Sequence, residues 1–170
     1  SAYWSELLDY FGGPPARVDL ELERRLQDLL VEGIAARIIT SAHDCSDGGL
    51  AVALAEACIG GPYAEQSLGA ALDLSGYAPH LTTPALLFAE DHGRVVISVP
   101  FDQRKALAAL ARRHRIPLFG AGRVGPPGEP LEIRGAADRV LRWDPAQLRE
   151  IYMSAIPRRM SHVATSGGEG

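Results

Sequence analysis

The chain has 170 residues and a formal net charge of −4, with 46% hydrophobic and 22% charged residues. This length suits one domain, or one domain with an arm, and the composition is typical of a folded protein rather than a disordered one. The acidic balance argues against a nucleic-acid-binding protein, no apolar run is long enough to span a membrane, and no signal peptide is recognisable. Because the chain opens on Ser1, we expect it to be a fragment of a longer protein.

The basic residues and the cysteines exclude two kinds of binding site. Positive charge comes from sixteen arginines and a single lysine, Lys105. A Walker-type phosphate loop ends in lysine, and no glycine-rich loop precedes Lys105, so the sequence carries no such loop. Cys45 and Cys58 have no Cys or His at zinc-binding spacing, which predicts free, reduced thiols in the cytoplasm.

The first half of the chain is predicted to alternate helices with short strands. Leucines at helical spacing predict the longest of these helices, and Asp19 is placed to cap it. A Gly-Gly-Pro-Pro run at 12–15 interrupts the chain before that helix. In chain order we expect a helix over 2–10, a helix over 19–36, a strand over 38–40, a loop over 43–49, a helix over 50–58 and a strand over 70–74.

The second half is predicted to hold more strands than helices. Asp102 and Asp144 are each placed to cap a helix, the second of which has Pro145 in its first turn. In chain order we expect a hairpin of strands over 86–88 and 94–99, a helix over 102–115, strands over 118–124, 131–133 and 139–141, and a last helix that starts at 144.

This order of elements predicts an α+β fold, in which a mixed, mostly antiparallel sheet is packed with helices. We expect one domain over residues 1–160. The Ser- and Gly-rich segment 161–170 is predicted to be a disordered tail.

One polar, glycine-containing segment, 41–50, lies between a predicted strand and a predicted helix. Gly48 and Gly49 allow a backbone to approach a ligand closely, and the free N–H groups at the start of a helix attract anions. Asp44 and Asp47 would repel a phosphate beside them, but they suit ribose hydroxyls, an amine or a Mg²⁺ ion that bridges to phosphate oxygens. We therefore expect backbone amides on a phosphate and the two carboxylates on metal or hydroxyls.

A simpler interpretation of the same segment stays open. Ser46 or Asp47 could cap the helix, and His43 could be a packed, hydrogen-bonded histidine that binds no ligand. The motif is more specific than a lone Gly-Gly pair but short, so the pattern alone does not choose between a ligand site and a helix cap.

Charged residues also gather at the tip of the predicted hairpin. Glu90, Asp91, His92 and Arg94 lie there, and loops often carry functional side chains. The alternative is a solvated turn with a surface Asp–Arg pair, which would contribute little to stability.

A third segment, 119–124, partly resembles a dinucleotide-binding fingerprint through Gly120 and Gly122. The next glycine, Gly125, is close to the fingerprint spacing but not on it, and two prolines follow instead of a helix. A strand with a bulge or with tight packing is therefore favoured over nucleotide binding.

The segment 41–56, which begins Ser-Ala-His-Asp-Cys-Ser-Asp-Gly-Gly-Leu, resembles the signature of a known family. Segments 19–23, 87–96 and 122–124 match that family in the same order. The resemblance is to the last domain in the synthetase subunits of phosphoribosylformylglycinamidine synthases, within the aminoimidazole-ribonucleotide-synthetase superfamily. It covers about residues 1–160.

The resemblance implies an α+β domain that follows an N-terminal ATP-binding domain in the same enzyme. Members of this family are ATP-dependent ligases of purine biosynthesis. They convert formylglycinamide ribonucleotide (FGAR) and glutamine-derived ammonia into formylglycinamidine ribonucleotide. The resemblance thus implies ATP and Mg²⁺ as cofactors, a glutaminase domain or subunit as a partner, and a fragment that is inactive by itself.

The resemblance also implies which residues face the substrate. The substrate-side residues are His43, Asp44, Ser46, Asp47, Gly48, Gly49, Glu90 and Arg94, and the metal-side residues are Asp44 and Asp47. The family's catalytic histidine belongs to the N-terminal part, so no residue of this chain is assigned to catalysis. Two alternatives stay open: a non-catalytic binding or assembly module, and a domain of a sister ATP-dependent kinase or synthetase in the same superfamily.

Overall fold

A computed structural model describes residues 1–13, 15–60, 64–135 and 139–166. Residue 14 of the predicted connector and residues 167–170 of the predicted tail lie outside the described residues. The elements in chain order are α1 (Ala2–Leu8), α2 (Leu20–Ala35), β1 (Ser41–Asp44), α3 (Gly49–Ile59), β2 (Gly69–Asp73), α4 (Thr83–Phe88), β3 (Val95–Ser98), the 3₁₀ turn Phe101–Gln103, α5 (Arg104–His114), β4 (Gly122–Gly125), β5 (Leu131–Arg134), β6 (Val140–Trp143) and α6 (Pro145–Ser166).

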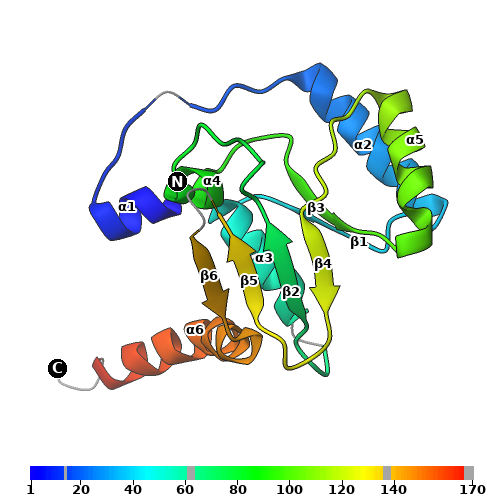
Figure 1. Ribbon diagram of the computed structural model, residues 1–170. Coiled ribbons are helices and arrows are strands. Elements are labelled where there is room, and N and C mark those ends of the chain that lie inside the picture. The colour runs from blue at the N-terminus through cyan, green and yellow to red at the C-terminus, as the bar shows by residue number, and fades with distance from the viewer. Residues whose placement is uncertain (14, 61–63, 136–138, 167–170) are drawn as a thin grey trace.

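The larger of two sheets has the strand order β4-β2-β5-β6 (Figure 1). β2 and β5 run parallel, with Leu72 opposite Ile133. β4 pairs with β2, and β6 pairs with β5, in the antiparallel sense. The sheet is therefore mixed and mostly antiparallel, and the predicted α+β fold is confirmed.

α3 covers one face of this sheet and forms the main core with it (Figure 1). Leu131 and Ile133 of β5 are almost fully excluded from solvent, and they pack in one cluster with the buried side of α3. α4 and α6 lie against α3. The small residues of α3, such as Ala53, let the helix approach its neighbours closely.

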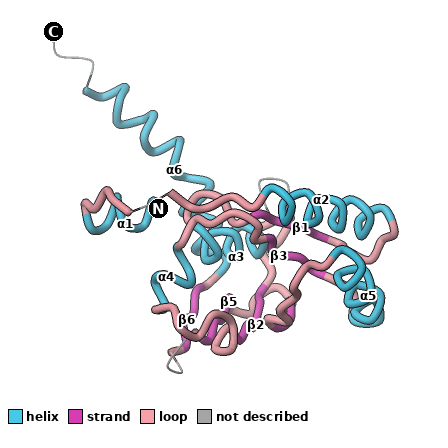
Figure 2. The backbone as a smooth tube through the Cα atoms, turned by 90° about the horizontal axis from the view of Figure 1, so that it is seen from above, coloured by secondary structure: helices cyan, strands magenta, loops and turns pink. Residues whose placement is uncertain are grey.

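β1 and β3 form a second, two-stranded antiparallel sheet, in which Ser41 lies opposite Ser98 and Asp44 opposite Val95. α2 and α5 lie together beside this sheet (Figure 2). A separate buried cluster holds this layer together through Leu29, Ile39, Leu110 and Ala111. The single sheet expected from the sequence is thus divided into two, each with its own apolar cluster.

The predicted strand over 38–40 is wrong in position. Ile38 and Ile39 donate their N–H groups to the Gly33 carbonyl and so close the end of α2. The ladder with β3 begins at Ser41 and extends through His43 and Asp44, the first two residues of the predicted loop. The isoleucines supply apolar packing beside the strand rather than the strand itself.

The first half of the predicted hairpin is also wrong, because residues 86–88 lie in α4. The hydroxyl of Thr82 accepts a hydrogen bond from the Ala85 N–H and caps this helix, which has Pro84 near its start. Leu86 and Leu87 are both only 1% exposed. The segment 89–93 therefore joins a buried helix to β3 and is not a hairpin tip.

The caps at the two outer helices are confirmed, whereas Asp102 does not cap α5. Asp19 accepts two N–H bonds at the start of α2, and Asp144 accepts one from Ala146 at the start of α6. Asp102 lies in the 3₁₀ turn before α5, which has no side-chain cap. Helix α6 continues to Ser166, and the proposed domain boundary at 160 stays a prediction.

Tight packing at the third glycine segment is confirmed, although β4 starts later than expected. Any side chain at Gly122 would collide with the Ala71 carbonyl on the neighbouring strand. No helix follows this strand, which agrees with the rejection of a dinucleotide-binding loop.

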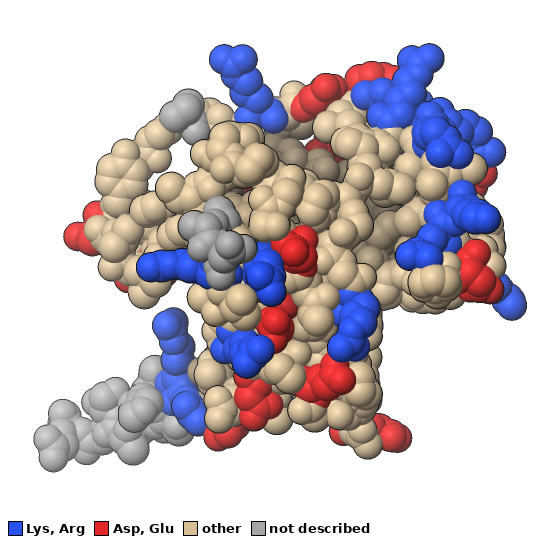
Figure 3. Space-filling model, viewed as in Figure 1, with Lys and Arg blue, Asp and Glu red and all other residues tan. Residues whose placement is uncertain are grey.

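Basic side chains gather where α2 and α5 lie, while acidic and basic residues alternate over the rest of the visible face (Figure 3). At the end of α5, Arg113 forms an ion pair with Glu32 of α2, and His114 Nε2 lies within hydrogen-bond distance of the same carboxylate. Positive charge at a helix C-terminus also offsets the helix dipole. Among the described residues, no helix combines the length and the apolar character needed to cross a membrane.

Candidate functional site

The junction between β1 and α3 has two halves that differ in exposure. Asp44, Ser46 and Asp47, which we call the acidic half, are exposed. Gly48 and Gly49, the glycine half, are half-buried and buried respectively. The acidic half therefore has side chains that a ligand in solvent can reach, whereas the glycine half could offer only main-chain groups, and these are partly or fully buried.

The acidic half carries two carboxylates, Asp44 and Asp47. The Ser46 hydroxyl donates a hydrogen bond to Asp44 Oδ2, and this bond lowers the pKa of Asp44 below its ordinary value. Within the described part of the chain, no three His, Cys, Asp or Glu residues come together as a metal-binding group. Two exposed carboxylates fit a Mg²⁺ ion that keeps several waters and takes further ligands from a phosphate, but not an ion held by the protein alone.

The glycine half is occupied by other parts of the chain. The Gly48 N–H donates to Glu90 Oε1 at 2.9 Å, and the Gly49 N–H donates to the Ser46 carbonyl at 3.0 Å. A Cβ at Gly49 would lie 2.6 Å from the Ala89 carbonyl oxygen. Gly49 is thus needed because the start of α3 touches the end of α4, and not because a ligand approaches there.

The alternative in which Ser46 or Asp47 caps the helix is not observed. The residue before α3 is Gly48, and it makes no side-chain cap. The carboxylate that accepts the Gly48 N–H belongs to Glu90, which is 42 residues away in the sequence. This bond holds the residue before α3, and the side chains of the acidic half take no part in it.

Glu90 lies in the loop after α4 and binds two backbone amides with one oxygen atom. Its Oε1 accepts hydrogen bonds from the Ala2 N–H at 2.8 Å and from the Gly48 N–H at 2.9 Å. Burial raises the pKa of Glu90, but the two N–H donors and the nearby amino terminus outweigh burial, and the net pKa is lowered. Its neighbours Asp91 and His92 are exposed.

Arg94 holds backbone carbonyls rather than an aspartate. Its guanidinium donates to the carbonyl oxygens of Leu86 and Ala89 at the end of α4. Its own carbonyl accepts the Cys45 N–H at 3.0 Å. Arg94 therefore links the end of α4 to the junction. Its guanidinium binds main-chain carbonyls and does not form the surface Asp–Arg pair that was the alternative.

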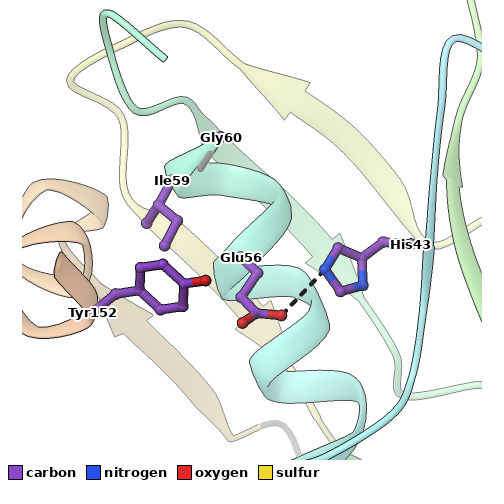
Figure 4. A pocket seen from close by; sticks show the side chains of 5 residues that line it. All are labelled: His43, Glu56, Ile59, Gly60 and Tyr152. Carbon is purple, nitrogen blue, oxygen red and sulfur yellow. Dashed lines mark ion pairs between the residues drawn. The ribbon is translucent and has the colours of Figure 1, made fainter. Parts of the chain in front are cut away.

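His43 points into a cavity of about 300 Å³ between β1, α3 and α6 (Figure 4). Its Nδ1 lies 2.8 Å from the Asp44 carbonyl, which can only accept, so Nδ1 is the donor. Its Nε2 lies 3.1 Å from Glu56 Oε2, an ion pair when both ring nitrogens are protonated. The hydrogen bonds foreseen in the simpler interpretation are present, and the ring is 34% exposed.

Glu56 and Tyr152 are the cavity residues that the sequence did not single out. Glu56 lies on α3 and Tyr152 on α6, and their side chains point toward the space beside His43 (Figure 4). Glu56 stands at the end of the signature segment, but nothing in the local pattern pairs it with His43. Tyr152 reaches the cavity only because α6 packs on α3.

The two cysteines are free and buried. Burial raises the pKa of both the Cys45 and the Cys58 thiol. A buried thiol with a raised pKa is a poor nucleophile and a poor metal ligand. Cys45 and Cys58 therefore act as small apolar residues of the core.

One known protein family matches most of the chain. Residues 3–130 match the family described as AIR synthase related protein, C-terminal domain. The chain is 39% identical over 166 residues to the phosphoribosylformylglycinamidine synthase subunit PurL of Parasynechococcus marenigrum (strain WH8102), which covers 98% of this chain and 20% of that protein. The chain thus spans about a fifth of the length of this curated relative.

Solved structures share the fold at low sequence identity. T. maritima PurL complexed with FGAR superposes with a TM-score of 0.63 and 19% identity, over 75% of this chain and 21% of that one. PurLQS from Thermotoga maritima gives a TM-score of 0.65 and 19% identity, over 86% of this chain and 24% of that one. T. maritima PurL is also known complexed with ATP. At these identities the likeness establishes the fold.

Proposed function

The chain belongs to the AIR synthase related protein, C-terminal domain family, and from this premise we propose that it is the C-terminal domain of a phosphoribosylformylglycinamidine synthase. The observation that carries the proposal is the match of 98% of the chain, at 39% identity, to a protein of that name. The domain extends over residues 1–160 in this proposal. The N-terminal ATP-binding domain belongs to the rest of the same longer protein.

In this role the chain is part of an ATP-dependent ligase that forms a C–N bond. FGAR and glutamine-derived ammonia are the substrates, and formylglycinamidine ribonucleotide is the product. The reaction turns an amide oxygen into a phosphate leaving group, which requires stabilisation of negative charge by Mg²⁺, amides or cations. T. maritima PurL complexes with FGAR and with ATP support both ligands.

The acidic half of the junction is the substrate-side surface in this proposal. Asp44 and Asp47 bind ribose hydroxyls, or a Mg²⁺ ion that also takes phosphate oxygens, and Ser46 holds the Asp44 carboxylate in its ionised form. Gly48, Gly49, Glu90 and Arg94 shape this surface from behind, as their bonds within the chain support.

In this proposal His43 positions β1 beside the substrate, and its ring nitrogens do not bind the substrate because both have partners within the chain. Its ring bonds to Glu56 and to the Asp44 carbonyl, so it fixes the end of β1 where the acidic half begins. The bond from the ring to the Asp44 carbonyl restrains the main chain that carries the first carboxylate of the acidic half.

The proposed synthase has a glutaminase domain or subunit as its protein partner and FGAR as its small-molecule partner. The PurLQS structure from Thermotoga maritima supports a multi-subunit assembly of the synthase. We place the enzyme in the cytoplasm because its small-molecule substrates and reduced thiols belong there.

The test is turnover by the intact synthase that contains this chain, with ammonia, ATP and FGAR as substrates. We expect formylglycinamidine ribonucleotide as the product and at least about a tenfold loss of turnover in Asp47→Ala. The neighbouring-loop variant Asp91→Ala is the matched control, because this carboxylate is also exposed but lies outside the junction segment 41–50. A different phosphorylated product would indicate a sister kinase, and turnover by the isolated chain would contradict the proposal of an inactive fragment.

A second candidate, a non-catalytic assembly module, is favoured by one observation. Helix α6 extends from the body of the molecule (Figures 1 and 2) and exposes Met153 by 42%, Ile156 by 72% and Met160 by 69%, which share one face because they are three and four residues apart. An apolar helix face of this kind is typical of an interaction surface. In that case Ile156→Asp would change the oligomeric state of the intact protein in size-exclusion chromatography, while Asp47→Ala would leave turnover unchanged.

A further inference from the structure

Three elements that are distant in the sequence meet at the carboxylate of Glu90. One oxygen atom accepts the N–H of Ala2, 88 residues away, and the N–H of Gly48, 42 residues away. Ala2 is the first residue of α1, and Gly48 directly precedes α3. Glu90 itself follows α4.

We propose that Glu90 is a positioning residue that couples the N-terminal arm, residues 1–13 and 15–19, to the acidic half of the junction. The coupling goes beyond the proposed function, because it concerns which parts of the chain move together and not which substrate is bound. Nothing in the side-chain chemistry of Glu90 requires it to touch a ligand, since its amide partners already occupy it.

The amide that Glu90 holds belongs to the peptide bond between Asp47 and Gly48. Fixing this peptide group fixes the main chain that carries the Asp47 side chain, because a peptide unit is planar and moves as one piece. Gly48 has a positive φ of 79°, a conformation that this bond helps to hold. Glu90 thus restrains the main chain from which the Asp47 side chain extends.

The other end of the coupling is the start of α1, which a second contact also docks. The Tyr3 ring stacks on Phe88 at the end of α4, with centroids 4.5 Å apart and an interplanar angle of 14°. Because the hydrogen bond uses the Ala2 peptide N–H, it does not depend on a free amino terminus. A displacement of the arm therefore pulls on the same oxygen atom that holds Gly48.

The charge and partial burial of Glu90 make this link stronger than a surface contact. Its side chain is 27% exposed, and hydrogen bonds to a carboxylate are about twice as strong as those between neutral groups. Arg94 reinforces the loop by binding the carbonyls of Leu86 and Ala89, on the other side of Glu90 in the sequence. The loop is thereby held from both its ends.

Amide hydrogen exchange measured by NMR on this chain tests the proposal without any assay of activity. We expect exchange at Gly48 to accelerate about tenfold in Glu90→Ala, because a charged hydrogen bond is lost. Glu90→Gln keeps an acceptor oxygen and should restore part of the protection. Asp91→Ala is the matched control, and it should leave exchange at Gly48 unchanged.

The decisive variant is Ala2→Pro, which deletes one N–H donor. Proline is well tolerated at the first position of a helix, so α1 is expected to persist, as circular dichroism can check. The Ala2 and Gly48 amides share only the Glu90 carboxylate. If Glu90 couples them, loss of the Ala2 N–H should make exchange at Gly48 about threefold faster. Unchanged exchange at Gly48 in Ala2→Pro would mean that Glu90 binds the two amides independently and would overturn the coupling. Unchanged exchange in both Glu90 variants would overturn the positioning role itself.

Discussion

The acidic half and the glycine half of the β1–α3 junction are adjacent in the sequence but differ in exposure and in their contacts with the rest of the chain. The side chains of Asp44, Ser46 and Asp47 are exposed, and the Ser46 hydroxyl donates to the Asp44 carboxylate. Gly48 and Gly49 bind a distant carboxylate and touch the end of a neighbouring helix. One short motif therefore divides into residues free to serve a ligand and residues that the fold requires.

The comparison shows why a glycine pair beside acidic residues is an ambiguous signal. Close approach of a backbone needs glycine whether the approaching group is a ligand or another part of the chain. In this protein the approaching group at Gly49 is the Leu87–Ala89 backbone. The two halves should then respond in opposite ways to substitution, one in stability and the other in ligand use.

The largest expected effect is that of Gly49→Ala on stability. The new Cβ would lie 2.6 Å from the Ala89 carbonyl oxygen, and the backbone has a φ of +67°. We expect the free energy of unfolding to fall by about 2–4 kcal/mol, since a collision in the core adds to backbone strain. Urea denaturation followed by circular dichroism measures this change.

Two other glycines separate the causes of that loss. At Gly128 a Cβ meets nothing within 4 Å but φ is +88°, so Gly128→Ala reports backbone strain alone. At Gly120 a Cβ also meets nothing within 4 Å, and Gly120→Ala is the control without strain. A loss at Gly49 no larger than that at Gly128 would show that the packing against α4 is unimportant.

The acidic half was found from the sequence because its signal is local. Polar and glycine residues between two predicted elements mark the junction, and the segment resembles a family signature. The strand before it was misplaced, however, because Ser41–Asp44 has little apolar character of its own. Its pairing with β3, more than fifty residues away, makes it a strand.

The partners of the glycine half could not be read from the sequence. Glu90 was singled out as a charged residue at a hairpin tip, but α4 replaces the first strand of that hairpin. Three apolar residues in a row do not distinguish a strand from a buried helix, and the cap at Thr82 was the overlooked signal. No local pattern links Glu90 to an amide 42 residues earlier.

The second prediction concerns acid stability and the glycine half. The pKa of Glu90 is lowered in the folded chain, so the unfolded chain binds more protons between the two pKa values. Its contribution is therefore present above the ordinary pKa of a glutamate and is lost as the pH falls through the lowered pKa of the folded chain. Other carboxylates titrate in the same range, so the quantity to measure is the difference in unfolding free energy between the wild type and Glu90→Gln.

That difference should shrink toward zero at low pH, because both chains then carry an uncharged side chain at position 90. A difference that stays constant from neutral pH to pH 3 would mean that ionisation of Glu90 does not stabilise the junction. Such a result would weaken the contrast between the two halves, since the glycine half would then depend on packing alone.

The third prediction concerns the tie that holds the start of the acidic half. His43 and Glu56 are 34% and 33% exposed, so solvent screens their attraction. A double-mutant cycle with His43→Gln and Glu56→Gln should give a coupling free energy of about 0.5 kcal/mol. A coupling above about 2 kcal/mol would show that the pair is a main support of the junction and that the acidic half is less independent of the fold than its exposure indicates.

The smallest expected effect on stability is that of Asp47→Asn. Its side chain is exposed, and substitutions of exposed residues usually change stability by less than about 0.5 kcal/mol. If the acidic half serves the ligand, the same variant should raise the Mg²⁺ concentration needed for half-maximal turnover of the intact synthase by about tenfold, because one ionised oxygen ligand is lost. Gly49→Ala should do the opposite: it should lower stability and leave the Mg²⁺ requirement of the remaining folded enzyme near that of the wild type. If Asp47→Asn instead lowered stability as much as Gly49→Ala and left the Mg²⁺ requirement unchanged, both halves would be structural, and the ligand surface would have to lie elsewhere in the synthase.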